Sequence, residues 1–277
     1  MTTTFPTEVI GTTARGEAPG ASLTTSALQV ARRTVRKFVR TPQLMVVGTI
    51  QGAMFLLIFR YVFGGAIDAG GVPYVDYLVP GFVATSVLFS GMSASAGVAE
   101  DIEHGFFDRL RSLPIPRLSV LSGRSLADTW LTTLNLTITV LVGFAVGFRL
   151  HGAIAAGIAA FALCVLFGFA LTWMFMTIGL FAGNAQAAQG MSLLVFPLTF
   201  VSSAYVPVSS MPGWLQAFAN HQPITPMVDT IRSLCLGDDA HAVLGHSTGH
   251  YLVQSLLWCV ALVAVFAPIA VARFRRV

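Results

Sequence analysis

The stretch that decides the fold is residues 153–181, AIAAGIAAFALCVLFGFALTWMFMTIGLF, in which no side chain is charged. A helix needs about 20 apolar residues to cross the roughly 30 Å hydrocarbon core of a bilayer. These residues are numerous enough to span it with tilt. The rest of the chain has the same character, because 55% of its 277 residues are hydrophobic and only 10% are charged. A soluble domain carries about a quarter charged residues. We therefore expect an integral membrane protein.

Five further apolar segments predict spans on either side of this one. They are residues 44–63, 77–98, 125–148, 188–206 and 251–271. Gly81, Ser86 and Gly91 in the second segment favour close helix packing through small residues. Pro197 predicts a kink in the fifth. The expected fold is an all-α membrane protein whose six transmembrane helices occupy residues 42–277.

The first 41 residues differ from the spans. Residues 1–22 are rich in Thr, Gly, Pro and Ala and lack an apolar block, which predicts a disordered cytoplasmic tail and no signal peptide. Residues 23–41 place Leu28, Ala31, Val35 and Phe38 on one helical face, with five basic side chains around the rest. This pattern predicts an amphipathic helix in the membrane interface. The alternative is an ordinary solvated helix, and the span that follows at once favours the interface.

Basic residues set the expected orientation. They gather before the first span, between spans two and three, and after span six: Arg32, Arg33, Arg36, Lys37 and Arg40; Arg109, Arg111, Arg117 and Arg124; Arg273, Arg275 and Arg276. With six spans all three groups share one side, so the positive-inside rule places both termini in the cytoplasm and the chain in the cell membrane. The net charge of +4 therefore reads as a topology signal, and nucleic acid is not an expected partner.

The sequence lacks the motifs for ATP hydrolysis, and its cysteines lack a metal-binding or disulfide pattern. A P-loop needs Gly-x-x-x-x-Gly-Lys-Ser/Thr, but the single lysine, Lys37, follows Arg36 and precedes Phe38. We expect no enzyme activity and no cofactor of the chain's own. Cys164, Cys235 and Cys259 show neither metal spacing nor a disulfide pattern. A metal could in principle bind the cluster Asp238, Asp239, His241, His246 and His250, although a solvated external loop is the favoured interpretation.

Asp128 is the only acid inside a predicted span. An ion-coupled transporter usually needs a titratable group at membrane depth. Asp128 follows Arg124 by one helical turn, and we predict a structural i,i+4 pair in preference to a proton carrier. This weakens the interpretation as an ion-coupled transporter.

The loop after the second span is unusually charged. Glu100, Asp101, Glu103 and Asp108 are followed by arginines, while Ile102, Phe106, Leu110 and Leu113 recur at helical spacing. A short helix here would show an apolar ridge and a charged flank, which suits docking into a groove of a cytoplasmic partner. The alternative is a solvated loop, but the adjacent apolar residues Phe106 and Phe107 disfavour it.

Two blocks of residues resemble a known family. The first block is Glu100, Gly105, Leu110, Pro114, Arg117, Gly123, Arg124 and Asp128. The second is Phe200–Pro207, Met211–Leu215, Asn220, Pro223, Thr225, Asp229, Arg232 and Gly237. Both are similar to the permeases of type-2 ATP-binding-cassette exporters, the daunorubicin-resistance group in particular. One departure is His221-Gln222, inserted where many members place Asn and Pro together.

The resemblance implies an assembly and a task. Two permeases, identical or sibling, would pair with two separate ATPase subunits that bind ATP and Mg²⁺. Residues 208–237 would form short helices that re-enter the outer leaflet. Coupling to the ATPase would involve Glu100, Asp101, Glu103, Gly105, Phe106, Arg109, Leu110, Pro114 and Arg117. The cargo would be a hydrophobic or amphipathic small molecule leaving the cell. A lipid or polysaccharide exporter of the same superfamily, or an ion-coupled multidrug transporter, are the alternatives.

The cargo pathway is expected to have apolar walls with scattered polar groups. Gln51, Asn135, Phe196 and Ser202 are the candidate lining residues. Each of them could equally be a packing residue or an interhelical hydrogen-bonding residue.

Overall fold

The computed structural model describes residues 23–39, 42–67, 71–107, 117–237, 240 and 244–275. Every regular element in these residues is a helix, and no strand occurs among them. The expected disordered tail, residues 1–22, lies outside the described residues. The elements are α1 (Leu23–Val39), α2 (Pro42–Ile58), the π-helical turn η1 (Phe59–Phe63), α3 (Tyr74–Glu103), α5 (Arg117–Val146), α6 (Ile154–Ala182), α7 (Ala185–Leu193), α8 (Pro197–Phe200), the 3₁₀ turn η2 (Val208–Ser210), α9 (Gly213–His221), α10 (Ile224–Leu236) and α11 (Thr248–Phe274).

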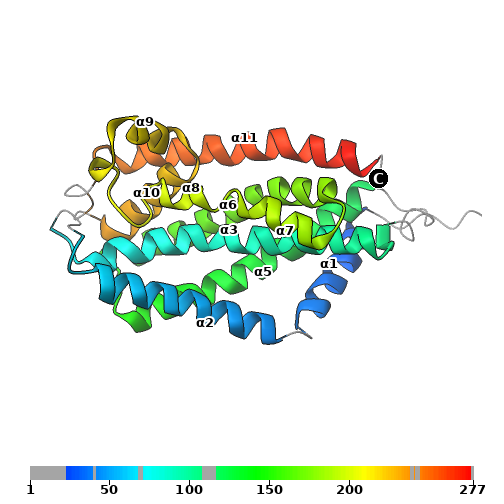
Figure 1. Cartoon of the computed structure of the whole chain (residues 1–277), viewed down its shortest axis with the longest axis horizontal. Coiled ribbons are helices and arrows are strands. Elements are labelled where there is room, and N and C mark those ends of the chain that lie inside the picture. Colours follow the sequence, from blue (N-terminus) through cyan, green and yellow to red (C-terminus); the bar gives the residue numbers. More distant parts are fainter. Residues whose placement is uncertain are drawn as a thin grey trace, which may run out of the picture.

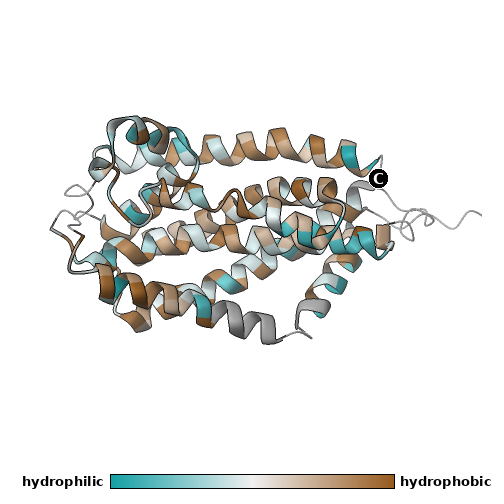
Figure 2. Cartoon of the chain, in the orientation of Figure 1, coloured by the Kyte–Doolittle hydropathy of each residue, from teal (hydrophilic) through white to brown (hydrophobic). Residues whose placement is uncertain are grey.

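Four helices in the described residues are long and apolar enough to cross a membrane. They are α3, α5 from Ser119 onward, α6 and α11, with mean hydropathy between 1.5 and 2.5. They match the second, third, fourth and sixth predicted spans. Figure 2 shows α11 as hydrophobic along most of its length, with hydrophilic residues at its C-terminal end. The prediction of an all-helical membrane chain is therefore confirmed.

The long helices lie side by side in one elongated bundle. Figure 1 shows α9 and α10 at one end, and α1 and the C-terminus toward the other. α3 is the central helix, because it packs against α5, α6, α7 and α10. Its most apolar window is 67% buried, against 17% for α5. The residues that α3 carries at its two ends are therefore well placed to join elements around it.

The first predicted span corresponds to α2 continued by η1. The two elements follow each other without a gap from Pro42 to Phe63. Within the part whose side chains are described, residues Ile50–Phe63 form a short apolar helix. A helix over the whole stretch would reach about 33 Å at 1.5 Å per residue, which is a membrane thickness.

The fifth predicted span is not one continuous helix. α7 ends at Leu193, and residues 194–196 form tight turns with i to i+3 hydrogen bonds, such as Phe196 N–H to the Leu193 carbonyl at 3.0 Å. Pro197 begins α8 and has no N–H to continue the α-helical ladder, while its ring crowds the carbonyl four residues earlier. The kink expected at Pro197 is thus a full interruption, and residues 201–206 after α8 are not helical.

The charged loop after the second span is shorter than expected. α3 continues to Glu103, so Glu100, Asp101 and Glu103 lie on its last turn and not on a separate helix. Gly105, with φ of +63°, then turns the chain. α5 begins at Arg117, which places Gly123 and Arg124 inside that helix. The remainder of the predicted coupling helix, residues 108–116, lies outside the described residues.

Candidate functional site

Three helices meet at a buried carboxylate near the C-terminal end of α3. Asp101 accepts a hydrogen bond from Arg124 of α5 at 2.6 Å and one from Arg33 of α1 at 3.3 Å. Arg124 also donates to Asp128 one turn further along α5 at 2.9 Å. We call these four residues, Arg33, Asp101, Arg124 and Asp128, the Asp101 cluster. The predicted i,i+4 pair of Arg124 and Asp128 is confirmed.

Burial makes the Asp101 cluster sensitive to change. The side chains of Asp101, Arg124 and Asp128 are each less than 10% exposed. Charges so far from water are stabilised only when each has close partners, and removing one partner is costly. Two opposite pairs share the site, so the formal charges of Arg33 and Arg124 balance those of Asp101 and Asp128. The cluster can therefore hold α1, α3 and α5 in one arrangement.

Two glycines allow α1, α3 and α5 to pack closely enough for the Asp101 cluster to form. A Cβ atom added to Gly97 of α3 would lie 2.3 Å from an Arg124 guanidinium nitrogen, and one added to Gly123 of α5 would lie 2.4 Å from the Ala27 carbonyl oxygen of α1. The absence of a side chain at Gly97 leaves room for the guanidinium, and at Gly123 it lets α1 rest on α5. Arg33 further covers the ring of Phe106, with 3.6 Å between its guanidinium carbon and the ring centre.

The predicted coupling residues differ in burial, and some of them lie outside the described residues. Asp101 is buried within the protein, Phe106 is half-buried under Arg33, and Gly105 makes the turn after α3. Glu103 is exposed and Glu100 is half-buried on the last turn of α3. Arg109, Leu110 and Pro114 lie outside the described residues, as does the side chain of Arg117, the first residue of α5. The structure thus brings Asp101 and Phe106 to α1, and leaves Glu103 facing outward.

Aromatic packing ties the same end of the bundle to α11. The ring of Phe107 meets that of Phe274 edge to face, with 5.0 Å between centres. Both rings are buried in a cluster that also holds Val98, Trp173 and Leu180. Such edge-to-face pairs contribute about 0.5–1.5 kcal/mol beyond their buried area. The end of α3 is therefore fixed on one side by charge and on the other by apolar contact.

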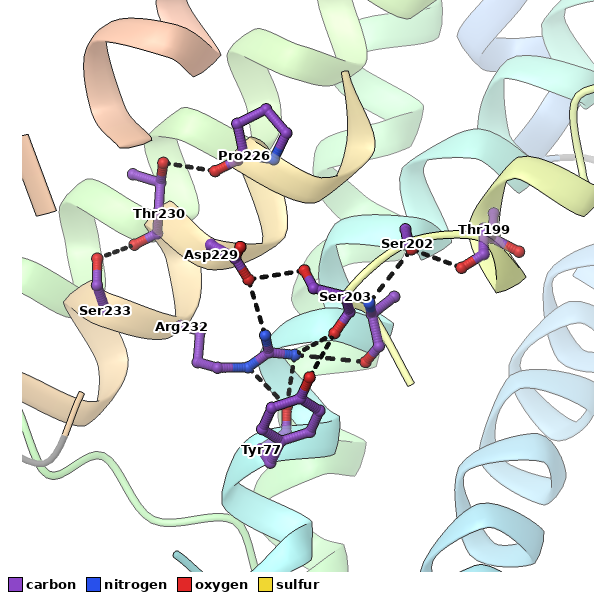
Figure 3. Close-up of polar contacts among 10 residues, drawn as sticks. Tyr77, Thr199, Ser202, Ser203, Pro226, Asp229, Thr230, Arg232 and Ser233 are labelled. Carbon is purple, nitrogen blue, oxygen red and sulfur yellow. Dashed lines mark hydrogen bonds and ion pairs between the residues drawn. The ribbon is translucent and has the colours of Figure 1, made fainter. Parts of the chain in front are cut away.

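A second buried charge pair lies at the opposite end of α3 (Figure 3). Arg232 of α10 is fully buried and donates to Asp229 at 2.9 Å, to the Ser203 carbonyl at 2.8 Å and to the Tyr77 carbonyl at 3.2 Å. Its guanidinium carbon is 3.6 Å from the centre of the Tyr77 ring. Asp229 also accepts from the Ser203 hydroxyl at 2.6 Å. We call Tyr77, Ser203, Asp229 and Arg232 the Arg232 cluster.

Side chains in and around the Arg232 cluster donate hydrogen bonds to the backbone carbonyls of the interrupted fifth segment. Tyr77 donates its hydroxyl to the Ser203 carbonyl at 2.9 Å, and Tyr74 donates to the Tyr205 carbonyl at 3.1 Å. The Gln222 amide donates to the carbonyls of Leu198 and Val201. Backbone that leaves a helix at membrane depth is tolerated only where protein groups replace its lost hydrogen bonds. Side chains from α3, from α10 and from Gln222, which follows α9, therefore hold residues 198–205 in their path.

Helix α10 is fastened to α11 as well. The hydroxyls of Thr230 and Ser255 lie 2.9 Å apart, and both are buried. Cys235, at the end of α10, is buried, and burial raises the pKa of its thiol to about 12. The thiol therefore stays protonated at neutral pH, which fits a packing role. Together with the Arg232 cluster, these contacts make α10 a bridge between α3 and α11.

The four pathway candidates lie around α3 but not in one group. The Phe196 ring packs against Phe89 of α3, with ring centres 5.4 Å apart and the planes tilted by 57°. Asn135 of α5 donates to Ser90, the next residue of α3, at 3.2 Å. Gln51 is exposed on α2. Ser202 is buried and donates to the Thr199 carbonyl, so it supports the chain after α8.

A row of aromatic rings extends from Phe196. Adjacent ring centres are 4.7–5.8 Å apart, and the row joins α2 and η1, α3, and the segment around α8. Its members are Phe55, Phe59, Phe82, Phe89, Phe196, Phe200 and Tyr205. Phe89 and Phe200 are 39% and 45% exposed, so part of the row faces away from the protein core.

Among the described residues, no group of three or more His, Cys, Asp or Glu side chains is arranged to hold a metal. Asp238, Asp239 and His241 of the predicted cluster lie outside the described residues. All three cysteines are free and buried.

Sequence reasoning missed the partners of the charged residues. The sequence pattern places Arg33 among the interfacial cations, whereas in the structure it bonds to Asp101, 68 residues away. Tyr77 begins the second predicted span and Tyr74 precedes it, and no pattern marks either as a donor to a carbonyl more than 120 residues later. The one available signal was the Asp229–Arg232 spacing of i,i+3, which is typical of a helical ion pair.

Comparison with known proteins identifies the family of this chain. The family of ABC-2 type transporters matches residues 25–236. A protein of Streptomyces coeruleorubidus named "Daunorubicin resistance ABC transporter permease protein" is 31% identical over 94% of this chain and 90% of its own length. A Mycobacterium tuberculosis protein named "Probable doxorubicin resistance ABC transporter permease protein" is 28% identical over 68% of this chain and 71% of its own. With its helical bundle and long apolar helices, this multi-pass membrane chain belongs to the ABC-2 type transporter family of permeases.

Proposed function

We propose that this chain is the membrane permease of a drug exporter, which moves a hydrophobic or amphipathic small molecule out of the cell. A separate subunit would bind ATP and Mg²⁺ and supply the energy. The observation that carries the proposal is the family match over residues 25–236, together with relatives named for daunorubicin and doxorubicin resistance. The single lysine of the chain, outside any P-loop motif, supports an ATPase in trans.

The proposed topology has six crossings with both termini in the cytoplasm of the cell membrane. The crossings are α2 with η1, α3, α5, α6, the α7–α8 segment, and α11. Four of them have the length and hydropathy of a span by themselves. The basic residues before α2, around the start of α5 and after α11 support the orientation. Helices α9 and α10 would then re-enter the outer leaflet, with α10 held by the Arg232 cluster.

Coupling to the ATPase is proposed at the end of α3. Glu103 is exposed there, and Glu100 lies on the same turn. The residues that follow, including Arg109, Leu110, Pro114 and Arg117, would complete the docking segment. Asp101 has another part in the proposal. Because its carboxylate is bonded to Arg33 and Arg124, it would pass a movement of the docking segment to α1 and α5.

The cargo path is proposed along the aromatic row. Rings present flat apolar surfaces to a flat apolar ligand, and Phe196, Asn135 and Gln51 lie on or near the elements that carry the row. Ser202 would act there only through the backbone it supports. The family implies a dimeric arrangement, so a second permease, identical or sibling, would complete the path. A lipid bilayer surrounds the assembly in this proposal.

The test is ATP-driven transport by the assembled complex. Inverted membrane vesicles containing the permease and its ATPase are expected to accumulate doxorubicin when ATP and Mg²⁺ are added, and to do so despite a protonophore. A Glu103→Arg variant should lose co-purification with the ATPase and lose transport. The matched control is Ser209→Arg, an exposed residue within η2 at the other end of the bundle. Transport abolished by the protonophore would favour ion coupling, and an unaffected Glu103→Arg variant would refute the docking surface.

A further inference from the structure

We propose that His246 and His250 form a two-nitrogen site for a divalent transition metal, with Cu²⁺ and Ni²⁺ as the ions that fit it best. His250 lies in the first turn of α11, and His246 lies in the loop before it. The two imidazole rings are exposed, with 4.6 Å between their centres and 38° between their planes. This pair belongs neither to the Asp101 cluster nor to the Arg232 cluster.

The ring nitrogens of this pair are available. Among the described residues, no hydrogen bond or ion pair engages either imidazole. Other histidines differ, because Nδ1 of His104 lies 2.8 Å from the Glu100 carbonyl and Nδ1 of His221 lies 2.7 Å from the Ala217 carbonyl. Nε2 of His151 lies 3.8 Å from Asp76. His246 and His250 are thus the described histidines whose rings meet each other while their nitrogens remain open to a ligand.

The spacing of the rings suits one metal ion. With metal–nitrogen bonds of about 2.0–2.1 Å, each ring centre lies about 3.2 Å from the metal. Two rings bound at about 90° then have centres about 4.5 Å apart, while the tetrahedral angle of zinc requires about 5.2 Å. The observed 4.6 Å fits adjacent positions of a square-planar or octahedral ion. Cu²⁺ and Ni²⁺ prefer such positions with nitrogen ligands, and Cu²⁺ binds most tightly in the divalent series.

Local contacts hold the two rings in place before a metal binds. The backbone N–H of His250 donates to the Ser247 carbonyl at 3.0 Å, which fixes the start of α11. The Tyr251 ring contacts both imidazoles edge-on, with centres 5.9 Å from His246 and 5.7 Å from His250. Tyr251 also interacts with the backbone at Gly245 and His246. These contacts keep the His246 and His250 rings beside each other, as a shared metal ion requires.

The chemistry limits the class of ion. Imidazole is a borderline ligand that suits Cu²⁺, Ni²⁺ and Zn²⁺, whereas Mg²⁺ and Ca²⁺ demand oxygen donors. With two protein nitrogens, water would fill the other positions and the ion would exchange readily. A bound ion would join the loop to α11, and so stabilise this end of the bundle by linkage.

The experiment is a Cu²⁺ titration of the full-length chain in lipid nanodiscs, followed by electron paramagnetic resonance. Two equatorial nitrogens are expected in the spectrum of the unmodified chain. His246→Ala and His250→Ala should each remove one nitrogen and weaken Cu²⁺ binding at least tenfold. The matched control, His221→Ala, should leave the spectrum and affinity unchanged. Mg²⁺ should not compete.

Two outcomes would overturn the site. One is a double variant, His246→Ala with His250→Ala, that binds Cu²⁺ with unchanged affinity and an unchanged spectrum. The other is competition by Mg²⁺ at equal concentration. Both rings are exposed, so the variants should keep the thermal-unfolding midpoint of the metal-free chain, and this measurement separates loss of a ligand from loss of the fold.

Discussion

Arg124 donates to the carboxylate of Asp101 at 2.6 Å, and this contact joins α5 to the last turn of α3. The same carboxylate receives Arg33 from α1. One buried acid therefore connects the amphipathic helix at the start of the chain with two long helices of the bundle. A movement at the exposed end of α3 would therefore reach α1 and α5 directly through Asp101.

Replacing Asp101 with Asn should destabilise the permease. The substitution keeps the shape but removes the charge that partners Arg33 and Arg124. Breaking a buried pair costs about 3–5 kcal/mol, and we expect the lower end because Arg124 retains Asp128. The thermal-unfolding midpoint in detergent should fall clearly. Glu103→Gln is the control, since an exposed change on the same turn should stay within about 0.5 kcal/mol. Equal midpoints for the two variants would contradict the role of the cluster.

Arg232→Lys should be poorly tolerated although it keeps the charge. The guanidinium of Arg232 serves Asp229 and the carbonyls of Tyr77 and Ser203 at once, and it lies flat on the Tyr77 ring. Lysine lacks the planar fork, and each buried acceptor left without a donor costs about 1–3 kcal/mol. Yield of folded protein by size-exclusion chromatography should drop sharply.

The matched control for that variant is Arg275→Lys. Arg275 is exposed after the end of α11, so the same chemical change there should leave the yield unchanged. If Arg232→Lys folded as well as this control, the hydrogen bond from Arg232 to the Ser203 carbonyl would not be needed to hold the broken segment.

A pair of glycine substitutions separates helix packing from helix propensity. Gly123→Ala would place a Cβ atom 2.4 Å from the Ala27 carbonyl oxygen and push α1 off α5, whereas Gly190→Ala on α7 meets nothing within 4 Å. Overpacking costs about 1–3 kcal/mol, while alanine in an open helical position gains up to about 1 kcal/mol. The unfolding midpoint should fall for Gly123→Ala and hold or rise for Gly190→Ala. Midpoints that moved together would argue against a close contact between α1 and α5.

Helix positions followed from hydropathy, but partners did not. The apolar run at residues 153–181 predicted α6 to within a residue at each end, because an uncharged stretch of that length has few other stable states in a bilayer. The Arg124–Asp128 pair was also within reach, since its spacing is local. The contact of Arg33 with Asp101 spans 68 residues, and only the packing of α1 on α5 creates it. A periodic pattern carries no information about such a distant neighbour.

The fifth segment shows the same limit from another side. Its hydropathy predicts a span, and Pro197 predicts a kink, but the path after α8 depends on donors from Tyr74, Tyr77, Gln222 and Arg232. Those donors come from α3, from α10 and from the turn between α9 and α10. The sequence marks where a helix can break, whereas the fold decides whether the freed carbonyls find partners.

Cysteine labelling tests the proposed orientation of the two ends of α3. Trp214 of α9 is 76% exposed and Glu103 is exposed at the opposite end of the bundle. With intact cells and a membrane-impermeant maleimide, Trp214→Cys should label at once, and Glu103→Cys only after the membrane is opened. The three native cysteines are buried and should not interfere. For Cys235, burial raises the pKa of the thiol to about 12, so the reactive thiolate is scarce at pH 8. Reactivity grows only as the pH rises toward 12, so the unmodified chain should stay unlabelled between pH 7 and 8. Labelling of Glu103→Cys in intact cells, with Trp214→Cys protected, would reverse the orientation and place the Asp101 cluster outside, where no ATPase could reach it.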